Sequence, residues 1–261
     1  MTTSHDLLQQ LENEGITYLR NKLDRKTISE IFPILRNSFE KHYSIQVRNG
    51  VENPSKGVAL NCLADSSEYL DFLEKIVIDE EVKYLLESFL GKSFILNSFS
   101  ALNTLKDEPN FSINVHRDIR HYSGNFNAMT NMLVMLDEFS IDSGSTRLFP
   151  KSHKSEHKPT DDEFMKNCIF AEGNPGDILV FNSNIWHASS LNVSGKPRRS
   201  IAITFSKPFI KQLVDYTKMM SVHEENCSPH MRQILGYNHR VAENLNQWYV
   251  PTKDRMYKNS Y

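Results

Sequence analysis

Two histidines and an aspartate in the second half of the chain have the residue types of a metal site. His116 and Asp118 are two positions apart, so on a β-strand, where side chains alternate between faces, both would project from the same face. His187 would have to come from another strand. Two imidazoles and one carboxylate form the facial triad that holds Fe(II) and leaves coordination positions open. The pattern predicts that His116, Asp118 and His187 bind a metal and form the catalytic centre.

The elements that must position this triad change character along the chain. Residues 1–93 carry apolar residues mainly at helical intervals, and Gly91 ends the last of these runs as a helix C-cap would. From 94 to 207 the period becomes two, and many short strands in one block predict a sandwich or barrel. The expected strands are Phe94 to Leu105, Asn114 to Arg120, Ala128 to Asp137, Thr146 to Phe149, Gly176 to Phe181, Ile185 to Leu191 and Arg198 to Ser206.

The remaining parts of the chain are predicted to be helical. Thr160 and Glu163 form a capping box, which predicts a short helix between strands. Residues 208–261 return to helical spacing as a C-terminal extension. The chain is thus expected to be one domain over 1–261, mainly β with flanking helices.

The segment around His187 resembles the C-terminal signature of the phytanoyl-CoA dioxygenase family of Fe(II)- and 2-oxoglutarate-dependent oxygenases. The resemblance is carried by Gly176-Asp177, by Trp186-His187-Ala188-Ser189, and by Arg198, which follows His187 by eleven positions. Upstream, Pro150 to His153 is similar to a family stretch that ends in proline-glycine-serine-histidine, with Lys151 in place of the glycine. The resemblance covers roughly residues 5–207.

The resemblance implies a double-stranded β-helix, a flattened barrel with the metal in its mouth, and the cofactors Fe(II), 2-oxoglutarate and O2. By similarity, Arg198 and Ser189 would bind the distal carboxylate of 2-oxoglutarate. Asn103 is a weaker cosubstrate candidate. The implied activity is that of a dioxygenase which hydroxylates a small molecule and converts 2-oxoglutarate to succinate and CO2.

The residue pattern of the last strand supports this arrangement without the family. Arg198 shares one face with Ser200, Ala202 and Thr204, whereas Arg199 shares the other face with Ile201, Ile203 and Phe205. The small, polar face has room for a ligand, and the aliphatic face would pack on helices. Arg198 is therefore predicted to point into the barrel and Arg199 away from it. The planar guanidinium suits two-pronged binding of a carboxylate.

Other functions remain open from the residues alone. Two histidines and a carboxylate also hold Zn²⁺ in hydrolases, although Arg198 would then have no role, and an inactive member could serve as a small-molecule binding module. Hydroxylation is not separable from desaturation, epoxidation or ring closure. Substrate contacts are expected from the loop 48–60, from the C-terminal helices, and from Arg117, Arg120 and Tyr122.

Composition excludes several classes of partner and location. Thirty basic against thirty-two acidic residues give a net charge of -2, so we expect no binding of nucleic acid or of an anionic membrane. We find no apolar stretch long enough to span a bilayer and no signal peptide, and we expect a cytoplasmic protein. The three cysteines form no C-x-x-C pair, which argues against disulfides and a cysteine zinc site. The oligomeric state is not predicted.

Overall fold

The computed structural model describes residues 3–106 and 112–255 and places a group of helices at the start of the chain. These are α1 (Ser4–Glu14), α2 (Arg25–Arg48), α3 (Ser67–Val77) and α4 (Glu80–Leu90), with the short strand β1 (Ile16–Leu19) after α1. Local signals set their ends. Thr3 and Asp6 form a capping box at the start of α1, and Gly15 ends it in the left-handed conformation.

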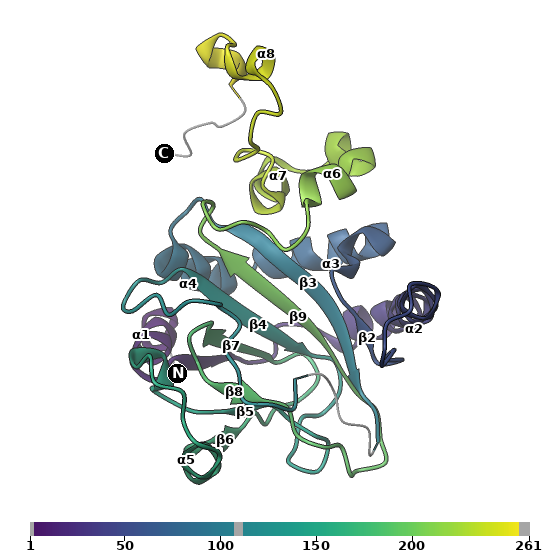
Figure 1. The fold of residues 1–261 in the computed structure, drawn as a ribbon, viewed down its shortest axis with the longest axis vertical. Coiled ribbons are helices and arrows are strands. Elements are labelled where there is room, and N and C mark those ends of the chain that lie inside the picture. Colours follow the sequence, from purple (N-terminus) through teal and green to yellow (C-terminus); the bar gives the residue numbers. More distant parts are fainter. Residues whose placement is uncertain (1–2, 107–111, 256–261) are drawn as a thin grey trace.

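Two antiparallel sheets follow. The larger has the order β1-β7-β4-β9-β3-β2 and the smaller β6-β5-β8. Because β3 and β4 both pair with β9, the last strand lies in the middle of the larger sheet (Figure 1). The strands after β1 are β2 (Val58–Ala59), β3 (Ile95–Thr104), β4 (Met129–Met135), β5 (Arg147–Leu148), β6 (Ile169–Phe170), β7 (Ile178–Asn182), β8 (His187–Ala188) and β9 (Arg198–Ser206).

The larger sheet separates two apolar clusters. On one face, Ile201, Ile203 and Phe205 of β9 are buried against the helices of the N-terminal part. On the other face, Leu133 of β4 and Leu148 of β5 belong to one smaller cluster, so the two sheets face each other across it. This arrangement confirms the predicted α+β class, with helices outside and a double layer of sheet inside (Figure 1).

Some predicted elements are shorter than expected or wrong. The strand predicted at 114–120 does not form: His116 makes an isolated bridge to His187, and the chain bends from Asp118 to His121. The strand predicted at 185–191 shortens to β8. The capping box of Thr160 does begin a helix, α5 (Asp161–Asn167).

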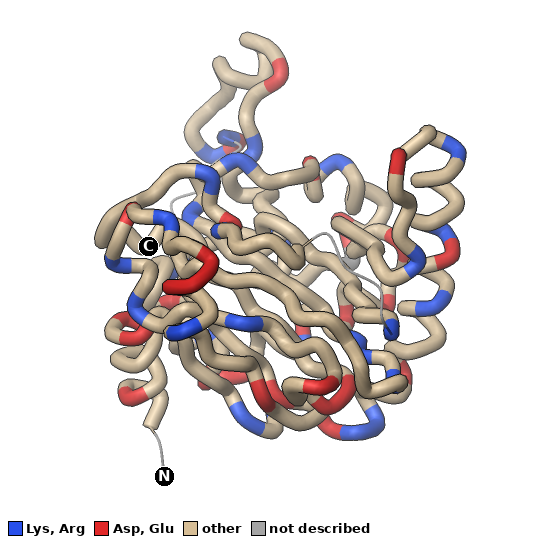
Figure 2. Tube along the Cα trace, turned by 60° about the horizontal axis from the view of Figure 1, so that its bottom comes forward, with Lys and Arg blue, Asp and Glu red and all other residues tan. Residues whose placement is uncertain are grey.

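The C-terminal extension beyond β9 consists of short helices joined by turns. They are α6 (Tyr216–Met219), α7 (Pro229–Leu235) and α8 (Leu245–Trp248), and they lie beyond one end of the larger sheet (Figure 1). Within the described ranges, none of the helices has the length and apolar character needed to cross a membrane. Basic and acidic residues are interspersed along the trace (Figure 2), in agreement with the small net charge.

Candidate metal centre and cosubstrate cavity

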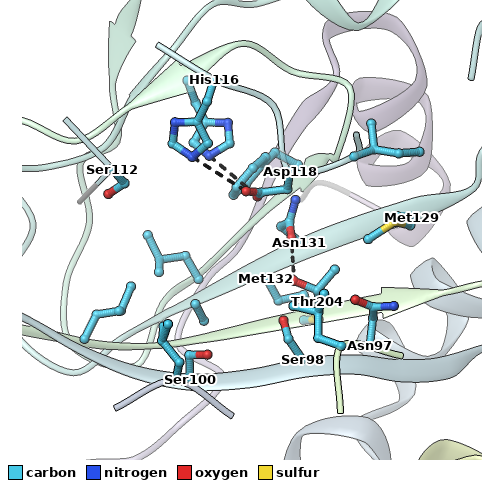
Figure 3. A pocket seen from close by; sticks show the side chains of 18 of the residues that line it. Asn97, Ser98, Ser100, Ser112, His116, Asp118, Met129, Asn131, Met132 and Thr204 are labelled. Carbon is cyan, nitrogen blue, oxygen red and sulfur yellow. Dashed lines mark hydrogen bonds and ion pairs between the residues drawn. The ribbon is translucent and has the colours of Figure 1, made fainter. Parts of the chain in front are cut away.

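The predicted triad converges in the structure. His116 Nε2 lies 3.6 Å from Asp118 Oδ1, and His187 Nε2 lies 3.5 Å from Asp118 Oδ2 (Figure 3). One ligand atom from each of the three residues lies within 4.8 Å of the others, which makes them a candidate metal site. The side chain of His187 is buried, whereas His116 and Asp118 are partly open to the cavity.

Main-chain hydrogen bonds orient both imidazoles. His116 Nδ1 is 2.8 Å from the carbonyl of Asn114, and His187 Nδ1 is 3.0 Å from the carbonyl of Ile185. Since a carbonyl can only accept, each Nδ1 donates its proton to that carbonyl, and each Nε2 is left facing Asp118, as a metal ligand would be. Burial lowers the pKa of His187, although the Asp118 carboxylate acts in the opposite direction. The lowered pKa favours the neutral imidazole of His187, which is the form that binds a metal.

The bend that carries Asp118 is held by the loop that precedes His187. Ile119 N donates to Ser183 O at 3.4 Å, and the Asn184 side-chain amide donates to Ser123 Oγ at 2.8 Å. Asn184 is buried, so this contact is shielded from water. Asp118 therefore reaches the histidines through a bend tied to the core, and not through the strand alternation that the sequence suggested.

Arg198 faces the same cavity as the triad and is almost fully buried, with 3% of its surface exposed. Its guanidinium donates to the Thr104 hydroxyl and lies 4.4 Å from the centre of the Phe139 ring. The Arg198 Nε has no hydrogen-bond partner, and no carboxylate of residues 3–106 or 112–255 forms an ion pair with it. Burial lowers the pKa of Arg198 to about 10, partly offset by Asp137.

The neighbouring arginine lies on the opposite face, as the strand alternation predicted. Arg199 binds the Asp137 carboxylate through Nε and a terminal nitrogen, each at 2.8 Å, and its guanidinium lies over Phe32 of α2. Arg198 is thus directed into the cavity, while Arg199 joins the sheet to a helix.

The other two cosubstrate candidates are placed differently. Ser189 follows β8, is buried and lines the cavity with His187. Asn103 also borders the cavity, but it pairs in register with Arg199, whereas Thr104 pairs with Arg198. Since paired residues share a face, Thr104 is the side chain beside Arg198, and sequence reasoning missed it. The signal lies in the β3–β9 register, which a single sequence does not reveal.

The floor of the cavity is made by the face of β9 that carries Arg198. Ser100 and Ala202 are opposite each other in the middle of this floor, and Thr204 lies near its far end (Figure 3). The cavity has a volume of about 960 Å³. Small side chains in its middle leave this space open between the arginine end and the far end.

Of the expected substrate contacts, Arg120 and Tyr122 line the cavity, and so do Ser55 and Leu60 of the predicted loop. Arg117 has another role. It donates to the carbonyls of Ser152 and Ser155 and lies 4.2 Å above the Trp186 ring. Arg117 therefore fastens the loop after β5 to the segment before His187.

The family follows from comparison with known proteins. The family model described as phytanoyl-CoA dioxygenase (PhyH) matches residues 12–200, and the chain belongs to this family, as its motifs indicated. The uncharacterized protein Rv1501 of Mycobacterium tuberculosis is 30% identical over 195 residues, which cover 73% of this chain and 67% of that protein. The dioxygenase cdmA of Talaromyces verruculosus is 24% identical over 93% of this chain and 86% of its own length.

Solved structures share the fold. The non-heme α-ketoglutarate-dependent epimerase SnoN from nogalamycin biosynthesis superposes with a TM-score of 0.60 at 14% identity, over 78% of this chain and 81% of SnoN. AviO1 from Streptomyces viridochromogenes superposes with a TM-score of 0.59 at 17% identity, over 80% of this chain and 97% of AviO1. These likenesses confirm the predicted jelly-roll core.

Proposed function

We propose that this protein is an Fe(II)- and 2-oxoglutarate-dependent dioxygenase that hydroxylates a small molecule. The observation that carries the proposal is the pairing, in one cavity, of the His116–Asp118–His187 cluster with a buried arginine that has no carboxylate partner among the described residues. A buried cation without a counter-ion is costly. An anionic cosubstrate would remove that cost.

The donor set fits iron. Two imidazole Nε2 atoms and one carboxylate would hold Fe(II) on one side and leave the cavity side open. When bound, iron with 2-oxoglutarate would activate O2, the oxidant, for attack on an unactivated carbon. The chain itself supplies fixed imidazole orientations through Asn114 and Ile185.

Arg198 would hold the distal carboxylate of 2-oxoglutarate, with Ser189 beside it and Thr104 fixing the guanidinium. Thr104 accepts one N–H of a terminal nitrogen of Arg198, and the other terminal N–H groups would donate to the ligand, while Nε is buried without a partner. A buried, desolvated guanidinium binds a carboxylate more strongly than an exposed one does. Asn103, on the opposite face at the cavity border, is the weaker member of this proposed set.

The alternatives make different use of Arg198. A zinc hydrolase needs a bound water but no buried cation at this place, and a binding module needs no metal. The structural neighbour SnoN, whose structure is known with Fe3+, α-ketoglutarate and nogalamycin RO, is an epimerase, and an epimerase would leave no new oxygen in its product. Oxygen incorporated from ¹⁸O2 would identify hydroxylation.

Anaerobic reconstitution tests the proposal. We expect the purified protein to bind one Fe(II) per chain, to develop an absorption band when 2-oxoglutarate is added, and to form succinate slowly after oxygen is admitted. The oxygenase assignment would be overturned by two results together. The protein would bind zinc tightly, and 2-oxoglutarate would cause no change in the absorption spectrum of either the iron-loaded or the cobalt-substituted protein.

A further inference from the structure

The cavity ends in an apolar rim on the side away from Arg198. Phe126, Phe209 and Leu213 line this end of the cavity, yet 48%, 70% and 61% of their surfaces are exposed. Leu60, which is 49% exposed, follows β2 and borders the cavity beside Ser100. Phe126 comes just before β4, and Phe209 comes just after β9. Six positions of β9 separate Arg198 from Thr204, which at ~3.3 Å per residue is about 20 Å. The rim is therefore well removed from the proposed cosubstrate end.

The two phenylalanines of the rim stack on each other. Their ring centroids are 5.8 Å apart and the ring planes differ by 29°. The Lys207 ammonium lies 5.3 Å from the centre of the Phe126 ring and donates to the carbonyl of Leu90. Large aromatic side chains that remain half exposed at the mouth of a cavity indicate a ligand contact.

Phe126 is held by the same loop that positions the metal cluster. Phe126 N donates to Ser123 O at 3.1 Å, and Ser123 Oγ is 2.8 Å from the carbonyl of Phe126. Ser123 is in turn bound to the buried Asn184, three positions before His187. The Phe126 ring and the segment before His187 are therefore held by one set of hydrogen bonds. A substrate contact needs such a fixed position relative to the metal ligands.

Phe209 is fixed in a similar way from the other side. Ile210 N donates to Lys207 O at 3.0 Å, Leu213 N donates to Asn97 O at 3.2 Å, and the Gln212 amide donates to Leu96 O at 2.7 Å. The first bond closes a turn within the segment 207–213, and the other two attach the segment to β3. The rim is consequently preformed on both sides of the opening.

Three polar side chains near this end of the cavity are already hydrogen-bonded within the protein. The Asn97 amide donates to Lys211 O, and the Asn131 side chain accepts from Thr204 and donates to Ser183. Among the described residues that line the cavity, Asp118 is the only acid. The rim itself thus offers mainly apolar and aromatic surface, while Arg120, His121 and Lys211 are basic residues that also line the cavity.

We propose that Phe126 and Phe209, with Leu60 and Leu213, form the substrate-recognition surface and select an apolar substrate built from several rings. A cavity of about 960 Å³ holds a ligand much larger than 2-oxoglutarate. The stacked pair of phenylalanine rings forms a broad apolar surface that is fixed on both sides, and a rigid ring system packs against such a surface with little loss of conformational freedom. Calling the ligand the substrate rests on the proposed function, whereas the binding surface itself can be tested without catalysis.

Fluorescence titration with Nile red, a neutral fused-ring probe, tests the surface. The full chain, anaerobically loaded with Fe(II) and 2-oxoglutarate, is compared with Phe126→Ala, Phe209→Ala and the control Tyr84→Ala. Tyr84 is 40% exposed on α4 and does not line the cavity. We expect each rim variant to weaken probe binding about tenfold or more and the control to have no effect. Progesterone should displace the probe at a concentration at least about tenfold lower than 1-dodecanol, a linear molecule.

The outcomes separate the two proposals. If both rim variants bind Nile red as the unmodified chain does, or if progesterone and 1-dodecanol compete equally, the proposed recognition surface is wrong. It is also wrong if light scattering shows that the unmodified protein is a dimer and that Phe209→Ala is a monomer, because a second copy of the chain would then cover the rim. If the probe binds at the rim but 2-oxoglutarate gives no absorption band with Fe(II), the proposed function fails and the ring-binding surface stands.

Discussion

His116 and His187 are joined by two main-chain hydrogen bonds, from His116 N to His187 O at 2.9 Å and from His187 N to His116 O at 3.0 Å. This reciprocal pair places both imidazoles on one face with their ring centroids 4.3 Å apart. Because the backbone makes the bridge, the loss of either side chain leaves it intact. The metal site and the strand pairing that supports it can therefore be separated by mutation.

We expect His187→Ala to lower Fe(II) affinity by more than about a hundredfold, because even residues that only support metal ligands contribute up to that amount, while the protein stays folded. His157→Ala is the control, since the side chain of His157 is 71% exposed and lies outside the triad. Anaerobic calorimetric titration with Fe(II) gives the affinity, and circular dichroism reports the fold. Equal affinities for the two variants would refute the metal assignment.

Arg198→Ala should raise the Kd for 2-oxoglutarate by about a hundredfold or more, since a desolvated charge-assisted contact contributes a few kcal/mol. Arg199→Ala should leave that Kd unchanged and instead lower the free energy of unfolding by about 1 to 2 kcal/mol, through the loss of Asp137 and Phe32. Titration of the absorption band and urea unfolding measure the two effects. The reverse pattern would mean that the register of β9 is shifted by one residue.

Thr104→Val should weaken 2-oxoglutarate binding by roughly three- to tenfold, because Arg198 loses the acceptor that fixes its guanidinium. The same change at Thr204, on the same face of the larger sheet but near the rim, should leave that affinity unaltered. Parallel titrations of the two valine variants make the comparison. A larger loss for Thr204→Val than for Thr104→Val would contradict the assigned cosubstrate end.

Gly176→Ala should destabilise the protein by about 2 to 4 kcal/mol, more than Gly195→Ala does. Both glycines have positive φ, but a Cβ at Gly176 would lie 2.3 Å from the Leu23 carbonyl oxygen, whereas a Cβ at Gly195 would meet open space. The pair thus isolates the steric contribution from the backbone strain that both share. Thermal and urea unfolding of the two variants check the ranking.

Asp177 gives a pH-dependent contribution to stability. Its carboxylate accepts from the main chains of Asn21 and Asn174 and pairs with Arg20 at 2.8 Å. Burial acts to raise the pKa of Asp177, but these bonds and Arg20 outweigh it and hold the pKa below the usual 3.8. The contribution is therefore fully present above about pH 4 to 5 and is lost as the pH falls through the lowered folded-state pKa.

Asp177→Asn should accordingly lower the free energy of unfolding by about 1 to 3 kcal/mol at pH 7. The difference from the unmodified protein should shrink as the pH falls below 3.8, where the unfolded carboxyl is protonated. Urea unfolding between pH 7 and pH 3 provides the measurement. A difference that grows toward low pH would show that the Asp177 carboxylate is not stabilised in the folded state.

The sequence predicted the parts of the site that depend on local alternation. Arg198 points inward and Arg199 outward because β9 is a regular strand. The same alternation turns Ile201 and Ile203 toward the helices. The residue that was missed, and the bend that carries the predicted ligand Asp118, depend on contacts between distant segments. Thr104 lies beside Arg198 through the β3–β9 register, and Asp118 reaches the histidines through a bend held by Ser183 and Asn184.

The C-terminal extension was predicted only as helical, and its short helices are separated by turns. The sequence does not predict the position of Phe209. Its contact with Phe126 depends on where β9 ends and on where the segment 207–213 attaches to β3. Spacing in the sequence says nothing about such contacts. Arg117, expected at the substrate, is used instead to hold a loop.

The position of β1 at the edge of the larger sheet has a consequence for biosynthesis. Ile16 pairs with Phe181 and Leu19 with Ile178, so β1 leaves the ribosome well before its partner strand, which lies about 160 residues later in the chain. Pairings of such long range form slowly. Until they form, the apolar faces of α1 to α4 have no complete sheet to cover them, and the nascent chain is exposed to aggregation until the later strands have been made.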